Sequence, residues 1–335
     1  MNPAIQAIIT IVIGVGGCVG YFYASNLFLD KVLFPARGPE AGRNITRANM
    51  VRPWLFLAPA IIALGLYLAY PVFATAWLSL TKPGPGNTNQ FVGLANYQQM
   101  LGESKFWESM RNNMLWLIVV PAMATAFGLL VATLTDRIWW GSIAKSLIFM
   151  PMAISFVGAS VIWKLIYDTR PAGQDQIGIL NALYLWFGGT DPQTWLTIPF
   201  WNNFFLMVVL VWIQAGFAMV ILSAALRAIP EETIEAAILD GANPFQIFFK
   251  IKVPQIFGTI VVVWTTITIT VLKVFDIVLA MTNGQWETQV LANYMYDKFF
   301  RAFDVGVGSA AAMVIMLLVT PILIWNVYNA RKEMR

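Results

Sequence analysis

Residues 235–254 read EAAILDGANPFQIFFKIKVP and separate two long apolar runs. Within this polar segment Gly241 predicts the end of one short helix, because glycine adopts a left-handed cap without steric penalty. Asn243-Pro244 predicts the start of a second helix, with asparagine as its N-cap. Upstream, Pro230 and the glutamates that follow favour a helix start. The pattern predicts a structured loop between two membrane-spanning segments.

The composition of the whole chain also indicates a membrane protein. Hydrophobic residues make up 59% of the 335 residues and charged residues 11%, whereas a soluble domain carries roughly 25% charged residues. Mean hydropathy is +0.68. The net charge of +4 reflects an excess of lysine and arginine in the loops rather than a basic nucleic-acid-binding surface. We therefore expect membrane lipids as partners and no nucleic acid.

About seven apolar segments are long enough to cross a bilayer core, which takes about 20 helical residues. Because lipid offers the backbone no hydrogen-bond partners, these segments should be helices, and the fold class is an all-α transmembrane bundle. No linker divides the chain, so we expect a single domain over 1–335, with an extra helix near 3–27 before a core at about 50–330. The expected spans lie near 3–27, 53–80, 112–135, 144–167, 202–227, 255–281 and 305–328.

Lysine and arginine indicate the orientation. If the loop 228–254 is cytoplasmic, the cytoplasmic set holds 13 of these residues, Arg137 and Arg335 among them, and the opposite set holds 7. This bias predicts an outside N-terminus and a cytoplasmic C-terminus. A secretory signal peptide is disfavoured for the first segment, because residues 1–21 carry no positive charge.

Several functions are disfavoured by missing residue types. The chain has no histidine and one cysteine, Cys18, which removes histidine-based acid–base chemistry and most His/Cys metal sites. It has no G-x-x-x-x-G-K-[ST] phosphate loop. We therefore expect neither an enzyme nor a cofactor in this chain.

The loop resembles the signature loop of the membrane subunits of bacterial ATP-binding-cassette (ABC) importers. The resemblance rests on Glu235-Ala-Ala, Gly241 and Ile251-x-Val253-Pro254 at the family spacing, with Val253 in place of the usual leucine. The alternative is an ordinary surface loop with common helix caps, which would not explain why all three features occur together. The residues expected to couple to the ATPase are Glu235, Ala236, Ala237, Asp240, Gly241, Pro244, Phe245, Ile251 and Pro254.

Other stretches are similar to the sugar-importing permeases, the group of the maltose and α-glucoside transporters. They are Leu226-Arg-Ala-Ile-Pro230, Lys273-Val-Phe-Asp276 and Thr282-Asn-Gly284, and the similarity covers about residues 50–335. At 283–286 the chain reads Asn-Gly-Gln-Trp where many relatives have a Gly-Gly-Pro run. The resemblance implies a type I ABC importer permease fold in the bacterial inner membrane.

The resemblance also implies the partners. Two separate ATPase subunits would bind ATP and Mg²⁺, a second permease would complete the pore, and an extracytoplasmic binding protein would deliver the sugar. Closure of the ATPases would move the loop as a rigid lever and switch the membrane helices between their two states.

Candidate sugar contacts come from two kinds of evidence. The maltose permease pattern implies Ile213, Gln214 and Phe217, although Gln214 could equally join helices and Phe217 could simply pack. Polar residues inside spans are costly and therefore suggest Thr270, Lys273 and Asp276. A Lys273–Asp276 pair at helical spacing could instead neutralise itself. Ser155 is a weaker candidate, because serine in a membrane helix often bonds its own backbone.

Some family features do not carry over. The polar ligand contacts of the family in the span near 255–281 are asparagines and a serine, and they fall on Ile267, Val271 and Val274 here. A permease of the same architecture for a polyol or glycerol phosphate therefore stays open as an alternative. A phosphate-bearing cargo would need a basic pocket, and Lys273 is the only basic residue well inside an expected span. A channel working alone would leave the signature loop without a role.

Overall fold

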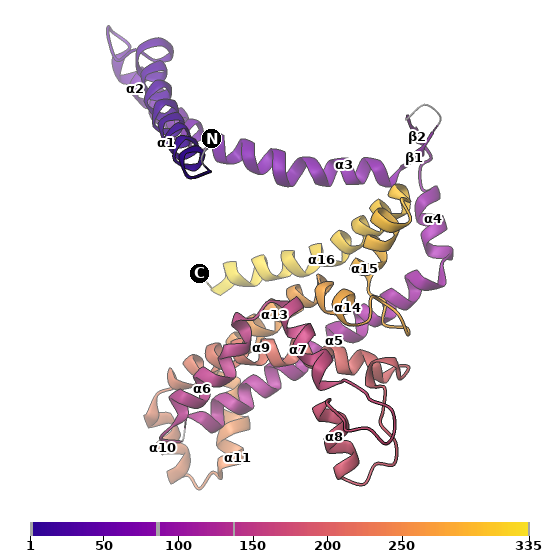
Figure 1. The fold of residues 1–335 in the computed structure, drawn as a ribbon. Helices are drawn as coiled ribbons and strands as arrows, with labels where there is room; N and C mark the ends of the chain where they lie inside the picture. Colours follow the sequence, from indigo (N-terminus) through magenta and orange to yellow (C-terminus); the bar gives the residue numbers. More distant parts are fainter. Residues whose placement is uncertain (1–2, 85–87, 137, 334–335) are drawn as a thin grey trace. The chain divides into compact units, whose positions relative to one another are not determined.

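The computed structural model describes residues 3–84, 88–136 and 138–333 (Figure 1). Arg137 and Arg335, which contributed to the predicted orientation, lie outside the described residues. The chain forms two compact units, Met1–Ala74 and Thr75–Arg335.

The first unit is a pair of long helices. Tyr21 donates a hydrogen bond to the carbonyl of Leu55 at 2.7 Å, and Arg52 pairs with Asp30 at 2.7 Å. Almost all of its side chains are exposed, as expected for helices that face lipid or another subunit. Its elements are α1 (Pro3–Phe28), the π-helical η1 (Leu29–Leu33), α2 (Ala41–Leu64), η2 (Gly65–Ala69) and the start of α3 (Tyr70–Ser79).

The second unit begins with the end of α3 and a two-stranded hairpin, in which Lys82 pairs with Gln90. Its elements are β1 (Thr81–Pro83), β2 (Asn89–Phe91), α4 (Ala95–Gly102), α5 (Ser104–Thr135), α6 (Gly141–Phe149), η4 (Met150–Ala153), α7 (Phe156–Ile166), α8 (Ile179–Trp186), η5 (Trp195–Thr197), α9 (Trp201–Arg227), α10 (Glu231–Leu239), α11 (Pro244–Ile247), η6 (Phe248–Lys252), α12 (Val253–Gln255), α13 (Phe257–Leu272), α14 (Asp276–Met281), α15 (Leu291–Tyr296), η7 (Asp297–Arg301) and α16 (Val305–Glu333).

Helices α5 and α9 form the centre of this unit and lie side by side (Figure 1). A Cβ atom added to Gly128 of α5 would lie 2.5 Å from the Cβ of Ala218 and 2.8 Å from the amide nitrogen of Met219. Glycine is therefore required for this approach, which small residues allow in membrane helix pairs. Around it, α9 buries thirteen of its 27 residues. The two helices act as the fixed frame of the unit.

The predicted spans are confirmed in part. Among the described residues, five helices are long and apolar enough to cross a membrane, or up to seven if each of two bent helix pairs is one span. The bent pairs are Gly141–Ala153 with Phe156–Ile166, at 107°, and Pro244–Gln255 with Phe257–Leu272, at 70°. The spans predicted near 144–167 and 255–281 correspond to these bent pairs, so the count of about seven holds if each pair crosses the membrane once.

Each break has a local cause. In the first pair Pro151 lies in a 3-10 turn, Ile154 is extended, and the Ser155 hydroxyl then caps α7 by accepting from the amide of Gly158 at 3.1 Å. Proline removes a backbone donor, so the helix stops rather than merely kinks. In the second pair α12 ends at Gln255 and α13 begins at Phe257, just after Pro254. A further interruption follows where α13 ends at Leu272 and α14 begins at Asp276.

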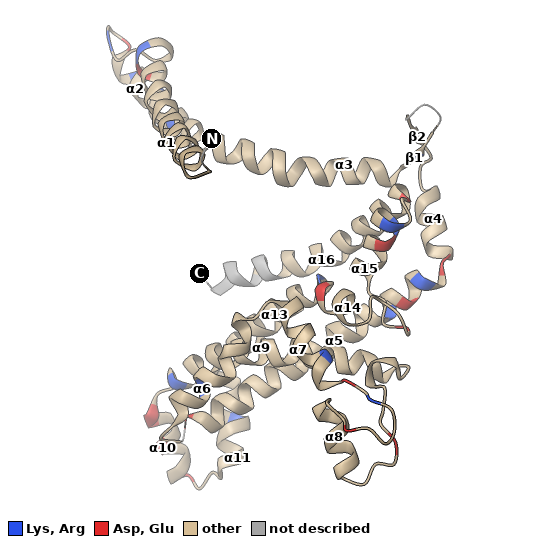
Figure 2. Cartoon of the chain, viewed as in Figure 1, with Lys and Arg blue, Asp and Glu red and all other residues tan. Residues whose placement is uncertain are grey.

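Charged residues gather at the ends of the long helices of this unit. Figure 2 shows tan middles in α5 and α9. The charges of α5 lie near its start, and the charge of α9 is Arg227 in its last turn. This placement keeps ionised groups close to water, because charge at the centre of a bilayer is costly.

Four buried asparagines hold the loop between α14 and α15. Asn112 of α5 donates to the carbonyls of Glu287 and Gln289, both at 2.8 Å, and Asn113 accepts from the amide of Leu291 at 2.7 Å. The other two, on α9, donate to the same loop: Asn202 to the Trp286 carbonyl at 2.5 Å and Asn203 to the Glu287 carbonyl at 3.2 Å.

This asparagine-held loop has an unusual backbone. Asn283, Trp286 and Glu287 have φ angles of 53°, 55° and 60°, and Gly284 has a φ of 70°. Left-handed backbone at residues other than glycine costs about 1–2 kcal/mol each. Such a conformation persists only where the surroundings enforce it. The asparagines of α5 and α9 supply that enforcement.

We expect Asn112→Ala to destabilise the second unit by about 1–3 kcal/mol, because it removes a hydrogen-bond donor from two carbonyls of the loop. The melting temperature of the detergent-solubilised protein should fall. Asn44→Ala is the control, since Asn44 makes one exposed hydrogen bond to the Pro35 carbonyl. Equal melting temperatures for the two variants would contradict the role of the asparagines.

Candidate functional site

The signature loop folds as two short helices with caps at both sides of the turn. Helix α10 ends in a Schellman motif: the amide of Gly241 donates to the Ile238 carbonyl and the amide of Ala242 to the Ala237 carbonyl, both at 3.0 Å. Gly241 has a φ of +81°, in the left-handed region. The predicted glycine cap is therefore confirmed: glycine has no Cβ atom and adopts this left-handed conformation without steric penalty.

The second helix starts with a complete capping box. The Asn243 side chain accepts from the amide of Gln246, and the Gln246 side chain accepts from the amide of Asn243, each at 2.9 Å. Pro244 occupies the first helical position, where its missing amide costs nothing. These reciprocal bonds confirm the predicted asparagine cap and make the turn between α10 and α11 a defined shape.

Most of the residues expected to couple to an ATPase are exposed. Ala237 is not, at 8% exposure, and packs within the chain, so only Ala236 of this pair is free to meet another surface. Ile247 is also buried, at 7%. The exposed members are Glu235, Ala236, Asp240, Gly241, Pro244, Phe245 and Pro254, while Ile251 is half-buried.

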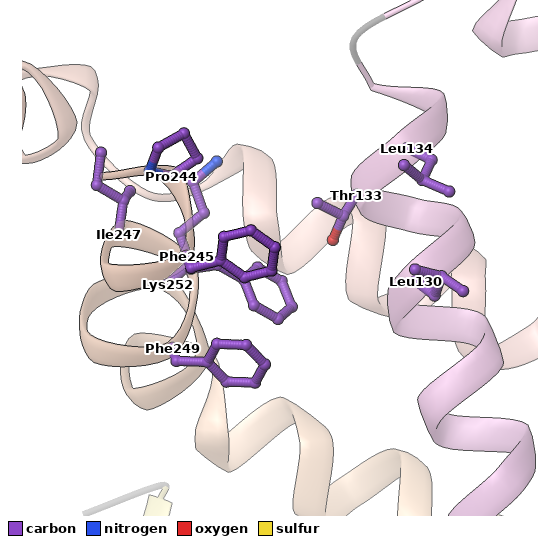
Figure 3. A pocket seen from close by; sticks show the side chains of 9 residues that line it. Leu130, Thr133, Leu134, Pro244, Phe245, Ile247, Phe249 and Lys252 are labelled. Atoms are coloured by element: carbon purple, nitrogen blue, oxygen red, sulfur yellow. The ribbon is translucent and has the colours of Figure 1, made fainter. Parts of the chain in front are cut away.

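An apolar cavity of about 300 Å³ separates α11 and η6 from the end of α5. Figure 3 shows the rings of Phe245 and Phe249 directed toward Leu130 and Thr133 of α5. Phe248 lines the same cavity, which confirms that the three phenylalanines share one apolar face. The cavity leaves part of the signature loop without close packing against α5, while the Ile247 side chain is buried.

Three of the candidate sugar contacts meet in a second cavity, of about 290 Å³. Thr270, Lys273 and Asp276 line it together with Phe156 of α7 and Leu210 of α9. The expectation that Lys273 and Asp276 share a helical face was wrong, because α13 ends between Thr270 and Lys273. The break in the helix brings them together instead. Within the part of the chain that the structure describes, no ion pair joins Lys273 to Asp276.

The candidates on α9 differ in accessibility. Ile213 is buried at 3% exposure in the main core cluster, whereas Gln214 and Phe217 are half-buried. Gln214 follows Leu210 by four residues and so lies on the same helical face as this cavity-lining residue. The side-chain amide of Gln214 forms no hydrogen bond with another described residue. Ser155 caps α7 beside Phe156 and uses its hydroxyl as an acceptor there.

Glu103, just before α5, joins two residues near α15. It accepts from the Tyr294 hydroxyl at 2.9 Å and from Lys298 at 2.6 Å. Burial raises the pKa of Tyr294, and the carboxylate of Glu103 raises it further. Tyr294 therefore stays a neutral donor at physiological pH.

The loop geometry and the membrane spans agree with the comparison to known families. Residues 124–335 match the model of the binding-protein-dependent transport system inner membrane component. The chain belongs to this family. It is a multi-pass permease subunit of an ABC importer in the inner membrane, and so a transport component rather than an enzyme.

Individual relatives support the family. The chain is 65% identical to the alpha-glucoside transport system permease protein AglF of Rhizobium meliloti (strain 1021), over 99% of both chains. It is 44% identical to the osmoprotective compounds uptake permease protein GgtC of Synechocystis sp., over 84% of this chain and 100% of that one. A permease chain of a bacterial alginate ABC importer has the same fold, with a TM-score of 0.72 at 20% identity over 86% of this chain and 98% of that one.

Sequence reasoning missed two groups of residues. One is the set of four asparagines, which occur as the pairs Asn112-Asn113 and Asn202-Asn203 near the N-terminal ends of two apolar spans. Their presence in otherwise apolar helices was the available signal. The other is Asp136, whose partners come from helices that no local pattern connects.

We expect Gln214→Ala to lower the rate of uptake about 3–10-fold, the effect of losing one hydrogen bond worth about 1 kcal/mol. The measurement is uptake of labelled cargo into membrane vesicles at matched protein levels. Val220→Ala is the control, because Val220 lies on the exposed side of α9 at 40% exposure. Unchanged uptake with Gln214→Ala would assign Gln214 to helix packing.

Proposed function

We propose that this chain is the permease of an importer for an α-glucoside of two or a few sugar units. The observation that carries the proposal is the 65% identity to an alpha-glucoside permease over 99% of both chains. The match covers 99% of this chain, so the residues of the cavity, the asparagine-held loop and the signature loop lie within the matched region. It supports the same class of cargo in both proteins.

The chemistry of the second cavity fits a neutral, hydroxyl-rich cargo. Its lining combines apolar surface from Phe156 and Leu210 with Thr270, one cation (Lys273) and one carboxylate (Asp276). Sugars need both flat apolar surface and hydrogen-bonding groups. A single cation beside a carboxylate offers little to a phosphate group, so a glycerol phosphate is disfavoured.

In this proposal the α10–α11 element docks on an ATPase subunit. Its outward side carries Glu235 and Asp240, and Leu239 is 87% exposed. Docking would remove this apolar side chain from water, which is favourable. ATP and Mg²⁺ would be bound by two such ATPase subunits, since this chain has no phosphate loop.

The remaining partners and the orientation belong to the same proposal. A second permease would complete the pore, and an extracytoplasmic binding protein would deliver the sugar. The loop 228–254 would face the cytoplasm, which places the N-terminus outside, the C-terminus inside and the asparagine-held loop on the outer side. The bias of lysine and arginine supports this orientation. A single transmembrane domain over 1–335 remains a prediction.

A second cargo class has one specific observation in its favour. The relative at 44% identity over 84% of this chain is an uptake permease for osmoprotective compounds. A small neutral polyol derivative would meet the same cavity chemistry as a sugar. The identity is lower, so the α-glucoside is the primary proposal.

The proposal is tested by purifying the tagged chain from its native membranes in mild detergent and identifying stoichiometric partners by mass spectrometry. We expect a P-loop ATPase and a second permease, and ATP-dependent uptake of labelled maltose, sucrose or trehalose into proteoliposomes when the binding protein is added. Uptake of a polyol osmolyte but none of these sugars would favour the second cargo. A chain recovered without an ATPase, while a control importer stays intact, would contradict the coupling role.

Gly241 provides a sharp test of the loop. A Cβ at Gly241 meets nothing within 4 Å, but its φ of +81° strains any β-branched residue by about 1–2 kcal/mol. We expect Gly241→Val to abolish transport and to leave the chain inserted in the membrane, because the turn between α10 and α11 changes shape. The measurement is uptake, together with the amount of chain in the membrane fraction.

Gly241→Asn is the matched control, because asparagine tolerates the left-handed conformation better than other side chains. It should retain a measurable part of the uptake that valine abolishes. Wild-type uptake in the valine variant would remove the coupling assignment.

A further inference from the structure

One carboxylate joins three helices at the end of the second unit where the signature loop begins. Asp136, which follows α5, accepts from the Ser223 hydroxyl at 3.2 Å and from Arg227 at 3.0 and 3.1 Å, both on α9. It also pairs with Lys145 of α6. Lys145 in turn donates to the Ser223 hydroxyl at 2.5 Å. We call these four residues the Asp136 cluster.

The cluster is largely shielded from solvent. The side chains of Lys145 and Asp136 are 15% and 21% exposed, whereas that of Arg227 is 65% exposed. Burial alone would raise the pKa of Asp136, but the hydrogen bonds and charges of Lys145 and Arg227 outweigh it and hold the pKa below its usual value. Asp136 is therefore ionised at physiological pH and keeps its partners.

The three helices of the cluster have different tasks. Arg227 is the last residue of α9, and three residues separate it from α10. Lys145 lies on α6, the first half of the broken span whose second half, α7, brings Phe156 to the polar cavity. Asp136 thus lies between the loop element and the span that shapes the candidate cargo site.

Helices α5 and α9 do not need the cluster to stay together, because they already pack closely at Gly128 and bury a long apolar seam. What the cluster adds is a polar link to α6. Helix α6 also packs on this frame through backbone and apolar contacts: Gly141 lies against the Thr135 carbonyl, the Ile148 carbonyl lies against Gly216, and the Ile148 side chain packs on the apolar core. An ion cluster is directional and can rearrange between two states, which apolar packing does less readily.

We propose that the Asp136 cluster is a latch that transmits movement of the α10–α11 element to the broken span α6–α7. Asp136 is a positioning residue in this scheme and does not touch cargo or nucleotide. The inference rests on the proposed coupling of the loop to an ATPase. It adds the route by which the movement reaches the cavity: from α10 to Arg227, through Asp136 to Lys145, and along α6 to α7.

The latch predicts a loss of coupling in addition to any loss of stability. Removing one partner of a largely buried ion pair lowers stability, so the measured quantity is a ratio that the amount of folded complex does not change. The test uses the purified complex in proteoliposomes with its binding protein and cargo. We expect Asp136→Asn to lower the amount of cargo transported per ATP hydrolysed at least 5-fold in the complex that assembles.

A second variant checks that the residues act as one unit. Lys145→Met should lower the same ratio, and the double variant should lower it no further than the larger single effect, since one broken link is enough. Additive losses would overturn the latch. So would transport and ATP hydrolysis that fall in the same proportion, as a simple loss of folded complex produces.

Asp30→Asn is the matched control. It removes the Asp30–Arg52 ion pair of the first unit, which is more exposed (34% for Arg52 and 49% for Asp30) and lies outside the proposed route. Its ratio of cargo to ATP should equal that of the wild type. If Asp136→Asn does not assemble, Ser223→Ala replaces it, since it removes one hydroxyl and no charge. We then expect a 2–3-fold drop in the ratio, and an unchanged ratio overturns the latch.

The same experiment separates the two proposals. A wild-type complex without ATP-dependent uptake contradicts the proposed function itself. Wild-type uptake with an unaltered ratio in Asp136→Asn contradicts the latch alone.

Discussion

The constraint on which this structure depends is that a bilayer core contains no water to satisfy backbone hydrogen bonds. Every segment at that depth must be helical or must bury its irregular backbone in protein. The chain meets this constraint with the α5–α9 pair, whose close contact at Gly128 forms a rigid frame. The two broken spans, α6–α7 and α12–α13, pack against that frame.

The two ends of the frame serve different purposes. At one end, four asparagines from α5 and α9 fix the loop at 282–291. At the other, Asp136 joins the frame to α6 next to the signature loop. The polar cavity lies between them, lined by residues of α7, α9 and α13. In the proposed transport cycle, the α5–α9 frame therefore meets the elements that would move, α6–α7 and the signature loop, at a few polar contacts.

Local chemistry was predictable from the sequence, and long-range chemistry was not. The caps at Gly241 and Asn243 are decided by residues within one turn, so the pattern determined them. The breaks near Pro151 and at Lys273 were not predicted, because hydropathy does not distinguish a kinked helix from two helices. Contacts such as Asp136 with Arg227 join residues 91 positions apart. A single sequence contains no signal for that distance.

The asparagine-held loop has one more consequence, for recognition. A surface that must first become ordered gives up part of its binding energy as conformational entropy. Here the backbone at Trp286 and Glu287 is already fixed from beneath, with the Trp286 side chain 51% exposed. A molecule that docks on this face meets a surface whose shape is set in advance. The affinity of that molecule then depends on its shape complementarity to the loop, and the loop loses little conformational entropy on binding.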